Sequence, residues 1–120
     1  MKKLTRKEEE LMQVLWGLEK GFVKDILDQY PDPKPHYNTV STLVRLLQEK
    51  GYIGHREYGN THEYYPVLSK EEYRRGFIKN VINEYFDSSY KKVVSYLMEE
   101  EKLKPEELEE IIQMIKNKKQ

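Results

Sequence analysis

Three prolines within five residues limit what this chain can form around its first quarter. Pro31, Pro33 and Pro35 lack the amide hydrogen that a helix interior needs, and each disfavours helical backbone in the residue before it. The apolar pattern from Val23 to Tyr30 therefore ends before residue 31, and a new helical pattern begins at Tyr37. The sequence predicts two helices with a tight, helix-free connection between them.

A further helix is expected before this pair. Thr5 and Glu8 have the spacing of a capping box, in which each side chain binds a backbone amide at the start of a helix. Leu11, Leu15 and Leu18 then fall on one face. We expect a first helix over about residues 5–18.

A β-hairpin is expected after the third helix, which should end near Lys50 because Gly51 follows. Two aromatic-rich stretches, residues 52–58 and 61–66, flank the dipeptide Gly59-Asn60, which is typical of tight turns. The order helix, helix, helix, hairpin is that of a winged helix-turn-helix. The fold class predicted is mainly α with a small hairpin (α+β), and residues 1–68 form the winged-helix domain.

Residues 69–120 form a second, entirely helical region. Ser69 and Glu72 make another capping box, Asp87 begins a break, and Pro105 suits the first turn of a last helix. These helices carry apolar faces too large to hide among themselves, so we expect a dimerisation region. Its predicted interface residues are Tyr73, Phe77, Val81, Tyr85, Val94, Leu97, Ile111, Ile112 and Ile115.

Composition supports association of the chain with a second copy. With 38% hydrophobic and 35% charged residues in 120, a single copy has little material for a core, and small domains bury a smaller fraction of their surface than large ones. The chain has no cysteine, which excludes disulfides and thiolate metal sites. The charged N-terminus and the lack of 18 consecutive apolar residues predict a cytoplasmic protein without membrane insertion.

The third helix has an outer face suited to DNA. Asn38, Ser41, Thr42 and Arg45 share one side, and short polar groups with an arginine are the side chains that read base edges in the major groove. Formal net charge is zero, so positive groups must be sorted onto one face, and the window 34–62 is locally positive. The predicted DNA-binding residues are Lys34, His36, Tyr37, Asn38, Thr39, Ser41, Thr42, Arg45, His55, Arg56, Tyr58, Asn60 and His62.

All three histidines, His36, His55 and His62, lie in that window. No pair has close helical spacing and no carboxylate–histidine motif accompanies them, so we expect phosphate contact or simple exposure and no metal ligation. No catalytic constellation or glycine-rich phosphate loop is present, which predicts a protein that is not an enzyme and needs no cofactor.

Three segments carry a family resemblance: Leu4–Trp16, Asn38–Ile53 and Tyr64–Ser69. Together the chain resembles the penicillinase-repressor (BlaI/MecI) family over essentially its whole length. The resemblance implies a winged-helix repressor whose C-terminal helices dimerise, so that two recognition helices meet a palindromic double-stranded DNA operator. It also implies, as a possible partner, a membrane-bound sensor protease or other antirepressor that relieves repression by cleavage in the dimerisation helices. A copper-responsive branch uses C-terminal cysteines, which this chain lacks.

The chain departs from the family pattern at several positions. Leu46 and Asn60 stand where the family often has basic residues, and Tyr96-Leu97 stands at the register of the family's scissile pair.

Two rival functions also fit the sequence. One is a winged helix used as a protein-interaction module, and the other is a regulator that senses a ligand or metal.

Overall fold

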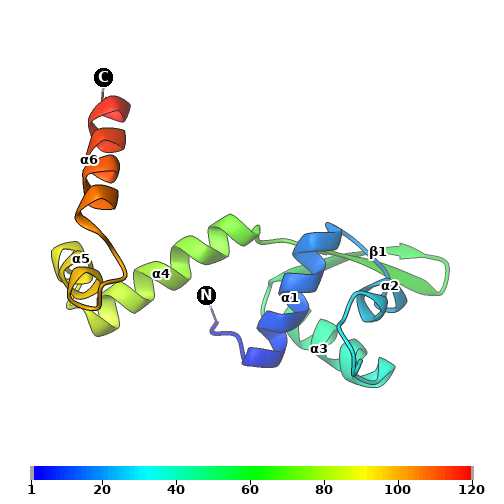
Figure 1. Cartoon of the computed structure of the whole chain (residues 1–120). Helices are drawn as coiled ribbons and strands as arrows, with labels where there is room; N and C mark the ends of the chain where they lie inside the picture. The colour runs from blue at the N-terminus through cyan, green and yellow to red at the C-terminus, as the bar shows by residue number, and fades with distance from the viewer. Residues whose placement is uncertain (1, 120) are drawn as a thin grey trace. The chain divides into compact units, whose positions relative to one another are not determined.

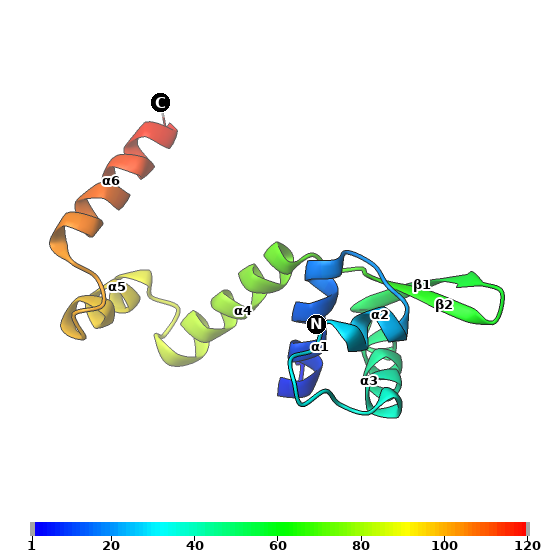
Figure 2. The same cartoon turned by 45° about the vertical axis from the view of Figure 1, so that its right-hand side comes forward.

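The structure, a computed structural model, describes residues 2–119 (Figures 1 and 2). The chain divides into two compact units, Met1–Arg74 and Arg75–Gln120. The first unit holds three helices and a two-stranded antiparallel sheet, in the predicted order. These elements are α1 (Arg6–Leu18), α2 (Val23–Asp28), α3 (Tyr37–Glu49), β1 (Ile53–Tyr58) and β2 (Thr61–Pro66).

The start of α1 has the predicted capping box. The Glu8 amide donates to Thr5 Oγ1 at 3.2 Å, and the Thr5 amide donates to Glu8 Oε1 at 2.8 Å. Glu8 is also buried, and Lys50 Nζ lies 2.6 Å from its Oε1. Burial acts to raise the pKa of Glu8, but the hydrogen bonds from Lys50 and Thr5 outweigh it and hold the pKa below its ordinary value.

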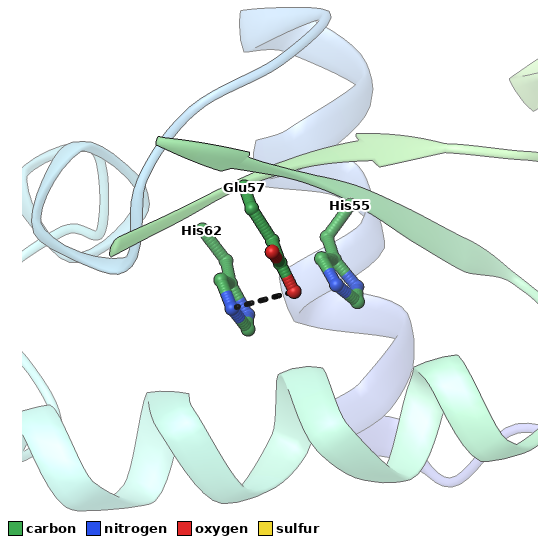
Figure 3. A group of neighbouring side chains, drawn as sticks. All are labelled: His55, Glu57 and His62. Carbon is green, nitrogen blue, oxygen red and sulfur yellow. Dashed lines mark ion pairs between the residues drawn. The ribbon is translucent and has the colours of Figure 1, made fainter. Parts of the chain in front are cut away.

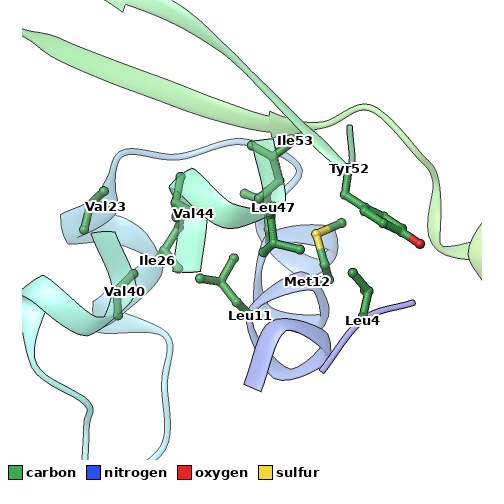
Figure 4. Close-up of a cluster of buried hydrophobic side chains, with 11 residues drawn as sticks. Leu4, Leu11, Met12, Val23, Ile26, Val40, Val44, Leu47, Tyr52 and Ile53 are labelled. Carbon is green, nitrogen blue, oxygen red and sulfur yellow. The ribbon is translucent and has the colours of Figure 1, made fainter. Parts of the chain in front are cut away.

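The core of the first unit lies where α1, α2 and α3 meet under the base of the hairpin (Figure 4). Each helix contributes its apolar stripe, because residues three and four apart fall on one side. The burial of these stripes is the main source of stability for so small a unit. The buried apolar residues are Leu4, Leu11, Met12, Leu15, Val23, Ile26, Val40, Val44, Leu47, Tyr52 and Ile53.

The hairpin, which we call the wing, turns at Gly59-Asn60 as predicted. Tyr58 pairs with Thr61 across the turn, and Gly59 has a φ of 58°, at the position where type II′ turns place glycine. Its base is tied to the loop between α1 and α2. The Gly21 amide donates to the Tyr64 carbonyl at 2.9 Å, and the Tyr64 amide donates back at 2.8 Å. The wing is therefore hydrogen-bonded to this loop through β2, and near the turn the Tyr58 ring lies 5.9 Å from that of Phe22.

The second unit contains most of α4 (Lys70–Tyr85), then α5 (Tyr90–Glu99) and α6 (Pro105–Lys119). Ser89 caps α5 by accepting a hydrogen bond from the Lys92 amide at 3.1 Å. Among residues 75–118 only Ile82 is buried. These helices therefore do not enclose a core of their own. No helix in the described part of the chain has the length and apolar character needed to cross a membrane.

Tyr73 lies elsewhere than the sequence grouping suggested. It belongs to the first unit, which extends past the predicted boundary at residue 68 to include the first turn of α4. Its ring centroid lies 5.5 Å from that of Trp16 and 6.1 Å from that of Tyr52, and its hydroxyl donates to Glu9 Oε2 at 2.8 Å. Tyr73 therefore packs on the winged-helix core, whereas the other predicted interface residues lie in the second unit.

Candidate nucleic-acid interface

Helix α3 presents one polar face to solvent. Val40, Val44 and Leu47 point into the core, which fixes the rotation of the helix. On the opposite side Asn38, Ser41, Thr42 and Arg45 are exposed. We call these four residues the α3 polar face. Their spacing of three and four residues makes them neighbours along one side of the helix.

The first turn of α3 leaves backbone donors available. Thr39 and Val40 donate their amides to the His36 carbonyl, at 3.0 and 3.2 Å, so the amides before them precede the intrahelical ladder. His36 is the N-cap residue and makes no side-chain cap hydrogen bond. Tyr37, Asn38 and Thr39 are exposed around this end. A helix start of this kind attracts phosphate, because free amides and the helix dipole both favour an anion.

Lys34 has a structural role. Its Nζ donates to the carbonyls of Asp28 at 2.9 Å and Tyr30 at 2.6 Å, at the C-terminal end of α2. The ammonium group thus satisfies carbonyls that have no helical partner. Lys34 is exposed at the connection between α2 and α3, and its contact with DNA, expected from the sequence, stays a prediction.

The wing has two different faces because successive side chains of a strand alternate. Arg56 and Tyr58 lie on one face and are exposed, and the Arg56 guanidinium lies 6.0 Å from the centre of the Tyr65 ring. Gly54 lies on the same face, and a Cβ added there would stand 2.7 Å from the Tyr65 ring. The glycine therefore permits the close approach of that ring.

The other face of the wing carries His55, Glu57 and His62, which point toward α3 (Figure 3). The imidazoles are stacked, with centroids 4.3 Å apart and an interplanar angle of 11°. Glu57 Oε1 lies 3.9 Å from His62 Nε2, and Gln48 Nε2 of α3 lies 2.6 Å from His55 Nδ1. The two-residue turn expected at Gly59-Asn60 already sets Glu57 opposite His62, so the signal for this grouping lies in the hairpin pattern, although helical spacing gives none.

A groove runs between the N-terminal ends of α2 and α3 and the wing. Its lining includes Lys24 from α2, Tyr37 and Ser41 from α3, and Asn60 and His62 from the wing. The groove thus joins residues predicted from the sequence with Lys24, which was not predicted. Lys24 carries no motif, and its place becomes visible only when α2 is packed against α3.

Three helices followed by an antiparallel wing, with the third helix polar on its outer side, define a winged-helix protein. The chain belongs to the penicillinase repressor family, whose profile matches residues 4–117. The fold agrees with the solution structure of the DNA binding domain of the repressor BlaI, at a TM-score of 0.52 and 23% identity, over 61% of this chain and 94% of that one.

Curated relatives match over almost the whole chain. The methicillin resistance regulatory protein MecI of Staphylococcus aureus (strain N315) is 25% identical over 116 residues, which cover 96% of this chain and 94% of MecI. The penicillinase repressor of Bacillus licheniformis is 23% identical over 117 residues, covering 93% of this chain and 88% of the repressor. Family and fold predicted from the sequence are confirmed.

Proposed function

We propose that this protein is a transcriptional repressor that binds a palindromic operator as a homodimer. The observation that carries the proposal is the α3 polar face, exposed on the third helix of a winged-helix domain in a chain of the penicillinase repressor family. Thr42 and Arg45 lie where the helix enters the major groove in such domains. Within residues 2–119 Arg45 has no acidic partner, so its guanidinium can bind a base edge or phosphate.

The wing supplies contacts to the DNA backbone. Arg56 and Tyr58 are exposed on this hairpin, and the Tyr58 ring next to the turn packs edge-on against Phe22 at 5.9 Å. A guanidinium on such a hairpin reaches phosphates more readily than base edges, and phosphate contacts position a protein without reading sequence. Arg56 thus contributes affinity and α3 contributes specificity.

The second unit supplies the dimer. Its helices expose apolar side chains that a second copy can bury, and a two-fold axis presents the same patch from both subunits. Burying one large aliphatic side chain contributes about 1.5–3 kcal/mol, so several per subunit outweigh the entropy cost of association. The exposed large apolar residues of this unit are Phe77, Ile78, Tyr85, Tyr90, Tyr96, Met98, Ile111, Ile112, Met114 and Ile115.

A substitution series on the full chain tests DNA binding, once selection from random DNA has given a bound sequence. Arg45→Ala should weaken that complex by about 1–3 kcal/mol and relax the base preference, with a smaller loss for Thr42→Ala. Arg56→Ala should weaken all sequences alike and lower the salt slope by about one. Arg6→Ala, on the exposed start of α1, is the matched control. Equal binding by Arg45→Ala and Arg6→Ala would contradict the assignment of α3.

Sedimentation tests the dimer. The full chain, with a monomer mass of 14.5 kDa, should sediment as a dimer. Ile112→Asp should shift it toward monomer because the new charge would be buried in the interface. Gln113→Asp adds the same charge to the next position of α6 and is the control. A monomeric wild-type chain that still binds a palindrome tightly would refute this part of the proposal.

We include relief of repression by proteolysis in the proposal, on the strength of the family resemblance. The Tyr96–Leu97 bond lies within α5, and cutting it would separate α6 with Ile111, Ile112 and Ile115 from the DNA-binding unit. The dimer would then lose much of its apolar contact. Leu97→Pro should abolish cutting at this bond by the cognate sensor protease. Mass spectrometry of the fragments would show whether the bond is cut.

A further inference from the structure

The pairing of the wing strands gathers metal-ligand side chains that are scattered in the sequence. Glu57 pairs directly with His62, and His55 stands two residues before Glu57 on the same face. One ligand atom from each of the three residues lies within 4.8 Å of the other two. The group is also open to solvent, since the Glu57 side chain is 73% exposed and that of His62 is 39% exposed.

We propose that His55, Glu57 and His62 form a binding site for a divalent transition-metal ion of the zinc class. Two imidazoles and one carboxylate are a ligand set that such ions favour, and three protein ligands leave a fourth position for water. Bonds of about 2.0–2.2 Å to each ligand require the three side chains to close by about 1 Å. The stacked imidazoles must also turn until their nitrogen lone pairs converge, which rotamer adjustment on a hairpin allows.

Gln48 of α3 supports the site from outside the ligand set. A metal-bound histidine commonly donates its other ring N–H to a neighbouring acceptor, which fixes the tautomer and the ring plane. Gln48 Nε2 lies 2.6 Å from His55 Nδ1, and a half-turn of the side-chain amide places its oxygen there as the acceptor. The Nε2 lone pair of His55 then becomes available to the ion. The recognition helix and the metal site would thus share one hydrogen bond.

Metal binding would act on DNA binding, and this step depends on the proposed function. The ion adds two positive charges on the wing face that points toward α3 and offsets the negative charge of Glu57. It also joins β1 to β2 near the turn, which makes the wing more rigid. Both effects favour phosphate contact, so the loaded protein should bind DNA more tightly than the metal-free protein.

Titration of the untagged full chain with Zn²⁺ in a calorimeter tests the site, and Co²⁺ as a second probe reports its coordination through visible d–d absorption. We expect one ion per chain with tetrahedral cobalt bands. The double variant His55→Ala/His62→Ala should lose binding, and the near-isosteric Glu57→Gln should weaken it. Gln48→Ala should lower the affinity by about ten- to a hundredfold, as outer partners of metal ligands do. His36→Ala removes the third histidine, outside the cluster, and should bind as wild type does.

The outcomes separate the site from the proposed function. Saturable one-to-one binding that the double variant loses and His36→Ala keeps would establish the site, whether or not the chain binds DNA. Wild-type binding in the double variant, or no saturable binding, would overturn it. For the regulatory step, the selected DNA is titrated with Zn²⁺-loaded and chelator-treated protein. Tighter binding by the loaded wild type that the double variant does not show supports the step, and equal affinities refute it.

Discussion

The Glu8–Lys50 contact gives the sharpest prediction about what holds α3 in place. Lys50 is the C-cap residue of α3, and its ammonium donates to Glu8 Oε1 at 2.6 Å and to the Lys3 carbonyl at 3.1 Å. The contact thus joins the end of the recognition helix to the start of α1. Lys50→Met keeps most of the side-chain length and removes only the charge and its hydrogen bonds.

The expected loss follows from the burial of the two groups. Removing one partner of a fully buried ion pair costs about 3–5 kcal/mol, because the other charge stays in place without compensation. The Glu8 side chain is 2% exposed, but that of Lys50 is 23% exposed and water screens it. Glu8 also keeps its capping hydrogen bonds to Thr5. We therefore expect Lys50→Met to lower the free energy of unfolding by about 2 kcal/mol.

The loss should depend on pH. The pKa of Glu8 in the folded chain lies below its ordinary value of 4.5, so its stabilising effect is present above pH 4.5 and is lost as the pH falls through the folded-state pKa. In Lys50→Met, burial is no longer outweighed by the lysine, and the pKa of Glu8 rises. Protonation then relieves the buried charge, so the difference between wild type and variant shrinks on acidification.

Urea denaturation followed by circular dichroism at neutral and acidic pH measures both effects. Lys7→Met, at an exposed position of α1, is the control and should change stability by no more than about 0.5 kcal/mol. If Lys50→Met is as stable as this control at neutral pH, the Glu8 carboxylate is stabilised without Lys50 and the predicted loss is wrong. A loss that stays constant on acidification would refute the pKa argument.

Three further substitutions test packing in the first unit by the same assay. Gly54→Ala should destabilise by about 1–3 kcal/mol, because the added methyl collides with the Tyr65 ring. Tyr30→Phe should raise stability by about 1 kcal/mol, since the Tyr30 hydroxyl is buried with no hydrogen-bond partner in the described part of the chain. Burial, together with the nearby Glu10 charge, raises the pKa of this hydroxyl to about 12. Trp16→Phe should cost about 1 kcal/mol or more through loss of the 2.9 Å hydrogen bond to the Leu68 carbonyl.

Features set by local chemistry were predictable from the sequence. The Thr5–Glu8 capping box and the Gly59-Asn60 turn depend on residues close together in the chain, and both are present. The helix-free stretch after α2 follows in the same way from the proline rings. The outward orientation of the α3 polar face was also predictable, because the apolar residues of the same helix define its inner side.

Features set by contacts between distant segments were not predictable. Tyr73 has the spacing of an α4 face, yet its hydroxyl finds Glu9 and its ring finds Trp16, both on α1. Periodicity places a residue on the apolar face of a helix, but it does not show which neighbouring element covers that face. The contacts of Lys34 with backbone carbonyls were not predictable for another reason. Those carbonyls become available only once α2 ends at Asp28.

The strand register of the wing restricts how its length can change during evolution. Successive side chains of β1 alternate between its two faces, so Arg56 and Tyr58 lie on one surface while His55 and Glu57 lie on the other. Residues that face each other in β1 and β2 lie on the same surface. Insertion or deletion of one residue within a strand would exchange the two surfaces beyond that point and turn the guanidinium toward α3. Insertions in matched pairs, one residue in each strand at the tip, only lengthen the hairpin. Related wings should therefore differ in length mostly by even numbers of residues.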